Sequence, residues 1–501
     1  MSRPTVPKPL VAALFGMTLT ALAGCAVGPD YKAPEEKLVA FHNAERATSQ
    51  KSAPALDQWW TGFNDPMLST MVDRALAQNL DMAAAVARVT QARAASRAAG
   101  AQLLPTFDLS ATAARQHQSV ISPLGALLSQ EPGYTRNFND FSVGPSASWE
   151  LDLFGGLRRG ARAASAEAQA AEANEAGARV MVAADTADAY LQVRGYQARL
   201  AVANDQIRTD ERLLRLVQDR YNAGAGTGRE TAQAEAVLLQ ARASVPLLKV
   251  ELEKQLNRLD VLMGVQPGTY AAELAVPADI PGVPAIPDAQ PTEMLRRRPD
   301  VIAAERRLAA SNERIGQAVS DYYPKLSLSG ALGFDSLTKD HLFSSAARQS
   351  VLSGGLRWRL FDFGKVGAEV KLAKGANAEA LAVYQASVLH AAEDVENALM
   401  LFSQTQQRNE TLAAQVKAVS KARDLSEQAY RAGSIPLTDV LAADTQLLTA
   451  RDQLDASRAD ASRSAVGVYR ALGGGWSLEA GHRAPEGQPN TLAKAASPPK
   501  L

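Results

Sequence analysis

The chain has 501 residues, equal numbers of acidic and basic side chains, and one cysteine. The zero net charge argues against a nucleic-acid partner, which calls for a basic excess. A lone cysteine cannot form an intramolecular disulfide. After the first residues no apolar run approaches the roughly 18 residues of a transmembrane helix, so any further crossing of a membrane would require β-strands.

The first residues have the order of a secretory signal. Basic side chains precede an apolar stretch over 10–23, and small residues follow it. The motif LAGC at 22–25 resembles the bacterial lipobox. The resemblance implies a signal peptide over 1–24, cleavage before Cys25, and acyl chains such as palmitate on that residue. Ala26 is not the aspartate that retains such lipoproteins in the inner membrane, so the outer membrane is expected. The alternative is that Cys25 is a small buried hydrophobic residue.

A helix, a strand hairpin and long helices follow in the first half of the chain. Asp65-Pro66 predicts a helix start, an acidic cap followed by proline in the first turn, and the helix is expected to run to about Gln102. Apolar and polar residues then alternate, which indicates a strand, and a hairpin is expected over about 104–154. The proline-free stretch 156–222 predicts one helix of roughly 100 Å, followed by a glycine-rich turn and a return helix.

The second half of the chain repeats the first. A shift of 209 superposes Trp149 on Trp358, and farther upstream a shift of 219 superposes Pro105 on Pro324. The first copy therefore has ten extra residues between its proline and its tryptophan. An offset that stays constant over so long a stretch indicates a tandem duplication.

The duplication sets the expected boundaries of the mature chain. They are a lipidated extended segment (25–64), repeat 1 (65–264), a proline-rich connector (265–290), repeat 2 (291–474, with its hairpin over about 323–363) and a polar, disordered tail (475–501).

Two hairpins per chain are too few strands to close a membrane barrel. Known membrane barrels have roughly eight strands or more, and an open sheet edge in hydrocarbon leaves backbone groups unpaired at several kcal/mol each. Copies of the chain are therefore expected to combine their strands. The alternative is a soluble sheet on a helical bundle, which the expected length of the helices disfavours.

Together these features resemble the TolC-like outer membrane factors, and the lipidated NodT/OprM branch most closely. The resemblance rests on the lipobox followed by VGPDY at 27–31, on WWTGFNDPMLSTMVDRALAQNLDM from Trp59, and on the duplicated units, and it covers nearly all of the mature chain. It implies an α+β membrane protein, a homotrimer with a 12-stranded outer-membrane β-barrel continued by a long periplasmic α-helical barrel. It also implies two partners, a periplasmic adaptor (membrane fusion) protein and an inner-membrane transporter, usually of the RND type.

The function that this resemblance implies is the outer-membrane channel of a tripartite efflux system, a passive exit duct for drugs and other small toxic compounds. A duct for type I protein secretion is the alternative within the family, and a structural periplasmic coiled-coil lipoprotein is the alternative from another class. An enzyme is not expected, because GAGTG at 224–228 follows a helix and lacks the lysine of a phosphate loop. The scattered histidines have no metal-ligand spacing, so no metal or cofactor is expected beyond the lipid.

The two turns that end the long helices are the candidate functional site. Gly224 and Gly433 stand where glycine commonly ends a helix. The family resemblance implies that these turns, with Gly226 and Ser434, form the periplasmic mouth and receive the adaptor.

The family resemblance also implies a gate at this mouth. The acids six residues after each glycine are expected to help close it, Tyr430 matches the family's gating tyrosine, and Asp444 is a further candidate acid. TolC has an arginine at the position of Ile435, so this contact is expected either to be missing or to be replaced by one with Arg229 or Arg431. The expected gate residues are Tyr430, Glu230, Asp439, Arg229, Arg431 and Asp444.

Overall fold

The computed structural model describes residues 26–34, 39–43, 54–287 and 297–477. The described chain forms two compact units. The sheet unit contains 26–34, 90–169 and 305–383, and the helical unit contains the other described residues. Cys25 and the expected signal peptide lie outside the described residues.

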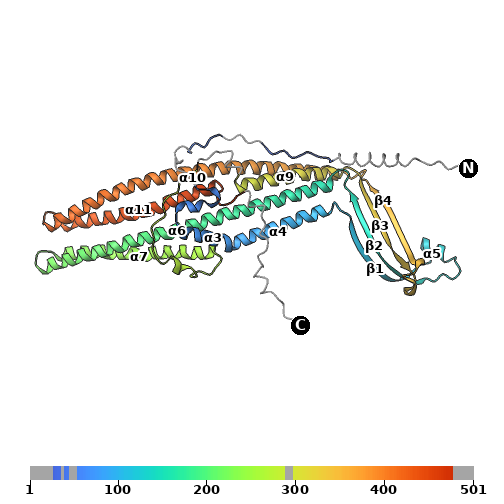
Figure 1. The fold of residues 1–501 in the computed structure, drawn as a ribbon, viewed down its shortest axis with the longest axis horizontal. Helices are drawn as coiled ribbons and strands as arrows, with labels where there is room; N and C mark the ends of the chain where they lie inside the picture. The colour runs from blue at the N-terminus through green and yellow to red at the C-terminus, as the bar shows by residue number, and fades with distance from the viewer. Residues whose placement is uncertain (1–25, 35–38, 44–53, 288–296, 478–501) are drawn as a thin grey trace. The chain divides into compact units, whose positions relative to one another are not determined.

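The helices of both units are shown in Figure 1. Their bounds are α3 (Pro66–Gln78), α4 (Leu80–Ala101), α5 (Pro123–Leu128), α6 (Gly156–Asn222), α7 (Gly228–Leu262), α9 (Pro299–Ser320), α10 (Lys365–Arg431) and α11 (Leu437–Ala471), with short 3-10 turns η1 (Leu56–Phe63), η2 (Ala271–Leu274), η3 (Lys339–His341) and η4 (Ser345–Ala347). The long helix α6 has the bounds that the proline-free stretch 156–222 predicts, and α10 begins and ends 209 residues farther along, as the duplication predicts. Among the described residues, no helix combines the length and the apolar character needed to cross a membrane.

The prediction of one continuous helix from Asp65 to Gln102 was wrong, because the chain forms two helices, α3 and α4, with a break between them. Asp65 does cap α3, because its carboxylate accepts the N–H groups of Met67 and Leu68 at 2.8 and 3.1 Å. The break comes at Asn79, whose extended backbone ends α3. Its amide oxygen accepts the N–H of Met82 at 3.0 Å and thereby caps α4, while its amide nitrogen donates to the Leu262 carbonyl at 2.8 Å. A tertiary hydrogen bond thus fixes a break that helix propensity alone does not predict.

The four predicted strands are confirmed. They are β1 (Thr106–His117), β2 (Asn137–Leu151), β3 (Lys325–Ser336) and β4 (Arg348–Arg357), and they form one antiparallel sheet in the order β1-β2-β3-β4. Within the described chain β1 pairs only with β2, and β4 pairs only with β3. The outer edges of β1 and β4 are therefore open.

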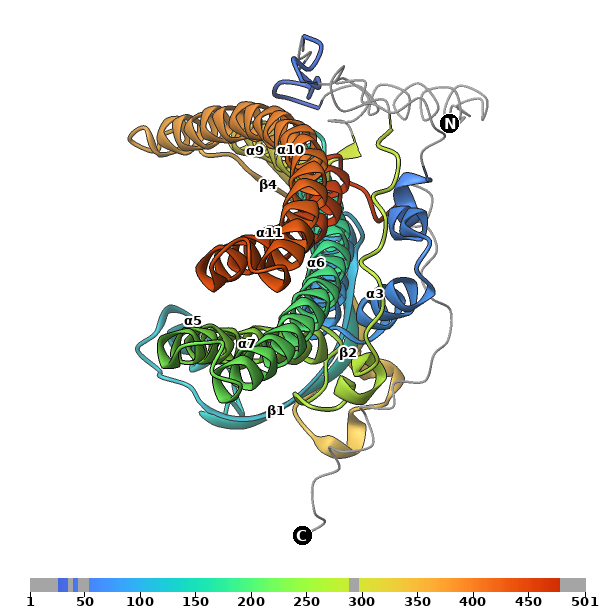
Figure 2. The ribbon, with the colours of Figure 1, turned by 90° about the vertical axis from the view of Figure 1, so that its left-hand side faces the viewer.

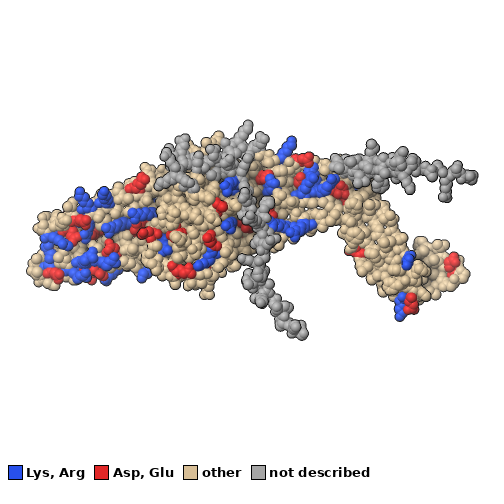
Figure 3. All heavy atoms as spheres, in the orientation of Figure 1, with Lys and Arg blue, Asp and Glu red and all other residues tan. Residues whose placement is uncertain are grey.

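The register gives the sheet one polar face and one apolar face. One row across the sheet consists of Thr106, Ser148, Ser329 and Ser353. The adjacent row, on the opposite face, consists of Phe107, Ala147, Gly330 and Leu352. Because side chains alternate between faces along a strand, the apolar face also carries Leu109, Val143 and Phe334. Toward the far end of the strands Arg115, Asn139 and Arg348 interrupt this face. The visible surface of the sheet carries few charged side chains, whereas both signs of charge are frequent on the helical unit (Figure 3).

Equivalent contacts at the base of the two hairpins show the duplication in space. The Trp149 indole N–H donates to the Leu103 carbonyl at 2.9 Å, and the Trp358 indole N–H donates to the Tyr322 carbonyl at 3.0 Å. These pairs are related by the shifts of 209 and 219 found in the sequence. Each tryptophan thus ties the end of its hairpin to the chain that enters it.

The core of the helical unit holds η1 against the long helices. Trp59 and Trp60 are 0% and 2% exposed, and the Trp59 ring stacks on Tyr469 of α11 at 5.3 Å. The predicted tail does not begin at Gly475, because its N–H donates to the Leu56 carbonyl at 2.7 Å and its carbonyl accepts from Arg179 at 2.7 Å. Residues 478–501 lie outside the described range.

Candidate functional site

The two helix tips are built alike. The first joins α6 to α7 and the second joins α10 to α11 (Figure 2). Gly224 and Gly433 both have φ of +73°, a left-handed conformation that favours glycine. Their N–H groups donate to the carbonyls of Tyr221 and Tyr430, in both cases at 2.9 Å. The glycines predicted to stop the long helices therefore do so by the same turn.

The two tips differ in how the return helix starts. In the first tip Thr227 caps α7, and the Glu230 carboxylate accepts the Thr227 N–H at 2.8 Å, which completes a capping box. In the second tip the N-cap is Pro436, which has no N–H and no polar side chain. Asp439 occupies the position equivalent to Glu230 but is exposed in the first turn of α11. Glu230 therefore has a local structural task, whereas the Asp439 carboxylate remains available for a contact outside its own helix end.

Tyr430 lies in the small apolar core of the tips. It is 3% exposed and packs with residues of three other helices, including Val217, Ala234 and Leu441. The Arg220 guanidinium lies 4.8 Å from the centre of its ring. Burial raises the pKa of the Tyr430 hydroxyl, the Arg220 charge opposes this rise, and the Glu230 charge adds to it. The hydroxyl has no hydrogen-bond partner within the described chain.

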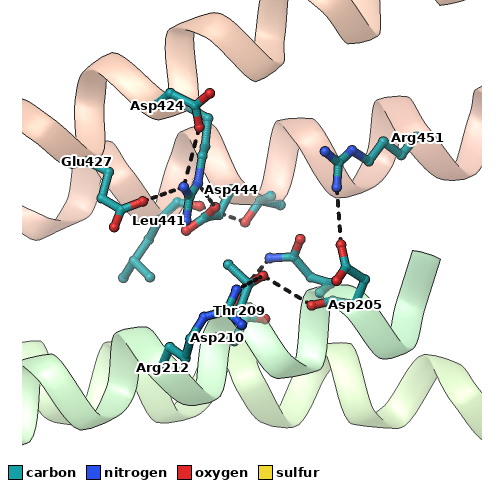
Figure 4. A network of polar contacts seen from close by, with 12 residues as sticks. Asp205, Thr209, Asp210, Arg212, Asp424, Glu427, Leu441, Asp444 and Arg451 are labelled. Carbon is teal, nitrogen blue, oxygen red and sulfur yellow. Dashed lines mark hydrogen bonds and ion pairs between the residues drawn. The ribbon is translucent and has the colours of Figure 1, made fainter. Parts of the chain in front are cut away.

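A chain of charges joins α10 to α11 beneath the second tip (Figure 4). Arg423, with 16% of its side chain exposed, donates to the Asp444 carboxylate at 2.7 Å. The same guanidinium pairs with Glu427 one turn along α10, and Glu427 also pairs with Arg431. Asp444 is 1% exposed, so this ion pair is buried. One arginine therefore neutralises a carboxylate that would otherwise be buried alone.

A second buried acid faces this network from α6. Asp210 is 2% exposed and accepts one hydrogen bond, from Gln206 at 2.8 Å. Burial raises the pKa of Asp210 to about 6, and the negative charge of Asp444 contributes to the rise. Burial also raises the pKa of Asp444, against the opposing effect of Arg423. One oxygen of each carboxylate has no partner within the described chain.

The structure separates the expected gate residues into three environments. Tyr430 and Asp444 are buried within the helical unit, Glu230 completes a helix cap, and Arg229 and Asp439 are exposed. Arg431 pairs with Glu427 and keeps 65% of its side chain exposed.

Sequence reasoning missed four residues of this site. They are Arg220, which covers the Tyr430 ring, and Asp210, Arg423 and Glu427 of the buried network. A shift of 209 gives none of them a counterpart of the same kind, because it relates Asp210 to Val419 and Leu214 to Arg423. The spacing of four residues from Arg423 to Glu427 to Arg431 was the one available signal.

Comparison with known proteins defines the class. The model of the family described as "Outer membrane efflux protein" matches residues 71–265 and 291–474. The pyoverdine export outer membrane protein OpmQ of Pseudomonas aeruginosa is 31% identical over 430 residues, which cover 86% of this chain and 90% of OpmQ. Nodulation protein T of Rhizobium leguminosarum bv. trifolii is 29% identical over 457 residues, 91% of this chain and 95% of that protein. The solved structure of the outer-membrane channel OprN superposes with a TM-score of 0.83 at 34% identity, over 90% of this chain and all of that one.

These likenesses identify the chain as an outer-membrane channel. It belongs to the outer membrane efflux protein family, in the NodT branch of the TolC-like channels, and is the outer-membrane component of a tripartite efflux system. The family and the fold class that the sequence predicts are confirmed.

Proposed function

We propose that three copies of this chain form a passive exit duct for small toxic compounds. The observation that carries the proposal is the two-faced sheet with two open edges. An open edge cannot face hydrocarbon, because each unpaired backbone group there costs several kcal/mol. Three sheets joined edge to edge leave no open edge, and they turn one face to lipid and the other to a lumen.

The exposure of the side chains agrees with this assignment. On the apolar face Phe107, Leu109 and Leu352 are 76%, 78% and 87% exposed within the single chain. So much exposed apolar surface suits contact with lipid. The opposite face presents hydroxyl groups, and Ser329 and Ser353 are hydrogen-bonded to one another at 2.8 Å. A polar lumen face favours conduction of solutes in water.

Small compounds are the proposed cargo. The relative OpmQ is named for export of pyoverdine, which supports a small-molecule duct over one for type I protein secretion. A structural lipoprotein without a channel would not need a sheet with two contrasting faces. The chain itself would carry out no reaction, and transport would be driven by its partners.

The helix tips are the proposed docking surface for a periplasmic adaptor, which links the channel to an inner-membrane transporter of the RND type. Gly224 and Gly433 have no other atoms near the place of an added side chain, so both turns present open backbone. Gly226 and Ser434 complete these turns. Charged side chains of both signs surround them on the helical unit (Figure 3), which suits a polar and reversible contact.

The gate is proposed to close through contacts between copies of the chain. Two groups favour this: the exposed Asp439 carboxylate, and the Tyr430 hydroxyl, which lacks a partner within the described chain. Because Tyr430 is only 3% exposed, its hydroxyl would reach a neighbouring copy after a rearrangement of the tip. Arg220, which lies over the Tyr430 ring, is better placed than Arg229 or Arg431 to supply the positive charge that Ile435 lacks. Each hydrogen bond to a charged group contributes about 1.5–3 kcal/mol, and less where water reaches it.

Single-channel recording in a planar bilayer tests this function. The wild type is expected to form pores, and Tyr430→Phe combined with Asp439→Ala is expected to raise the conductance because both closing contacts are lost. The matched control is Tyr221→Phe, the equivalent tyrosine of the first repeat, which is 52% exposed. A wild type that forms no pores would refute the channel function. A double variant that conducts like the wild type, as an intact trimer, would place the gate elsewhere.

A lipid on Cys25 is the proposed second attachment to the membrane. The segment that follows it is held at the base of the sheet, where the Val27 N–H donates to the Phe154 carbonyl at 3.1 Å. The buried Arg159 fixes the same segment through Asp30, at 2.9 Å, and through Glu313, at 3.0 Å. Acyl chains at residue 25 would therefore start next to the strand ends.

Mass spectrometry of the mature N-terminus tests the lipid. The wild type is expected to begin at Cys25 and to carry acyl chains, whereas Cys25→Ser is expected to lose acylation and to retain its signal peptide. The control is Ser52→Cys, which adds a thiol outside the lipobox and is expected to remain unacylated. An unmodified thiol on wild-type Cys25 would contradict the proposal.

A further inference from the structure

The last strand of the second hairpin is shorter than its counterpart. β2 extends to Leu151, and the shift of 209 makes Leu360 the equivalent residue of the second repeat. β4 nevertheless ends at Arg357. The three residues that would continue it are exposed, with Trp358 at 54% and Leu360 at 78%. The sequence that forms a strand in the first repeat therefore lacks a partner in the second.

The missing partner follows from the internal pairing. The end of β2 lies against the start of β3, with Trp149 opposite Leu328 and Glu150 opposite Ser327. This pairing joins repeat 1 to repeat 2. In a closed ring the only other kind of junction joins repeat 2 of one chain to repeat 1 of the next, and a duplicated chain can build both junctions alike.

We propose that β4 continues to Leu360 and pairs with β1 of a second copy in the register of the β2–β3 junction, so that Arg359 opposes Asp108 of the partner subunit. Moving Glu150 forward by 209 gives Arg359, and moving Ser327 back by 219 gives Asp108. By the same shifts Trp358 opposes Leu109 of the partner subunit. The inference rests on the proposed trimer and specifies how its chains join.

The chemistry of the opposed residues fits this register. Asp108 shares the polar face with Thr106 and Ser110. Arg359 lies an even number of residues from Ser353 and Arg357, so an extended β4 would place it on the same polar face. Both side chains are exposed in the single chain. Oppositely charged side chains directly across an antiparallel pair attract one another, so the junction places an ion pair on the lumen face.

An aromatic contact supports the same junction. Phe154 stacks on Tyr323 at 4.6 Å, where repeat 1 meets repeat 2. The equivalent residues are Phe363, which is 91% exposed, and Leu104, which is 65% exposed. The proposed junction brings these two exposed apolar side chains, from different copies, into the place of that stack.

Disulfide trapping tests the register. In the proposed junction Ser110 opposes Arg357 of the next copy, as Ser148 opposes Ser329 within the chain. Opposed Cβ atoms lie about 4.5–5.5 Å apart, which a disulfide can bridge after a small adjustment. Ser110→Cys with Arg357→Cys is expected to give a covalent trimer that reduction dissolves. The matched control, Ser110→Cys with Ser353→Cys, displaces one thiol by four residues, about 13 Å along the strand, and is expected to give none.

Charge reversal provides the second measurement. Asp108→Arg and Arg359→Asp are each expected to lower the temperature at which the trimer dissociates in detergent, and the two together are expected to restore it. Asp108→Arg with Arg357→Asp is the control that should not restore it.

The outcomes separate this inference from the proposed function. A wild type that is monomeric by mass in detergent would remove the trimer, and the junction with it. A stable trimer that cross-links in the control pair, or in neither pair, would keep the trimer and overturn this register.

Discussion

Replacing Arg423 with alanine is expected to speed hydrogen exchange of the backbone amides near Asp444 about 100-fold. Arg423 donates to Asp444 at 2.7 Å, and this carboxylate is only 1% exposed. Removing one partner of a buried ion pair costs about 3–5 kcal/mol, and each 1.4 kcal/mol is roughly a factor of ten in an equilibrium. Asp444 can take up a proton once Arg423 is gone, which places the effect at the lower end of this range.

Arg431, on the same helix as Arg423, provides a matched control. Arg431 also lies on α10 and pairs with the same Glu427, but 65% of its side chain is exposed. Exposed ion pairs contribute roughly 0–1 kcal/mol, so Arg431→Ala is expected to change exchange by a few-fold at most. Arg423→Lys is expected to fall between the two, because lysine keeps the charge but loses the planar set of donors that reaches Asp424, Glu427 and Asp444.

The same variants show whether the buried ion pair holds the second tip together. A destabilised tip is expected to raise the conductance of Arg423→Ala pores, since α10 and α11 are then less firmly joined. If exchange near Asp444 is as slow in Arg423→Ala as in Arg431→Ala, the ion pair does not hold the tip together and its apolar core does so alone.

The parts of the fold that the sequence predicts are those with local signals. The ends of α6 and α10 coincide with the predicted ones because a glycine with left-handed backbone stops each helix. The strand faces were predicted because alternation at period two needs only neighbouring residues, and the observed register keeps Phe107 on the apolar face. Duplication strengthened both predictions, since each signal occurs twice.

The parts that the sequence did not predict depend on contacts between distant residues. Asn79 breaks a helix because its side chain reaches the Leu262 carbonyl. The capping box of Glu230 is an exception, because its partner Thr227 is only three residues away and the pattern Thr-x-x-Glu is a local helix-start signal that the sequence analysis did not use. Asp439 has no such box, since Pro436 stands at the position of Thr227. The buried ion pair of Arg423 with Asp444 joins two helices, and the charge of Asp444 also acts on Asp210 in the other repeat. Neither the spacing nor the duplication of the sequence indicates this arrangement.

Lowering the pH from 7 to 5 is expected to increase the stability of the helix tips by about 1 kcal/mol. The cause is Asp210, whose pKa burial raises to about 6 from the ordinary value of 3.8. Because the folded chain binds this proton more tightly than the unfolded chain, the charged form costs stability above pH 6. That cost is relieved as the pH falls through about 6, and it is absent below the pKa of the unfolded chain.

The charged groups around Asp210 do not reverse the direction of this pH dependence. The groups that face it or border its network are Gln206 and Asp205 on α6, Arg423, Asp424 and Glu427 on α10, and Asp444 and Arg451 on α11. Burial also raises the pKa of Asp444, so its protonation acts in the same direction. Arg423 opposes both shifts but is already shared between Asp444 and Glu427.

Asp210→Asn tests which acid is responsible. Asparagine keeps a group that can accept from Gln206 but carries no charge, so the variant is expected to be more stable than the wild type at pH 7. It is also expected to lose most of the gain between pH 7 and 5, measured as protection of amides near Asp210 after correction for intrinsic exchange. Asp219→Asn, an exposed acid on the same helix, serves as the control and is expected to keep the full dependence. If Asp210→Asn also keeps the full gain in stability between pH 7 and 5, then Asp444 is the acid that takes up the proton. The pH dependence would then arise from the ion pair of Asp444 with Arg423.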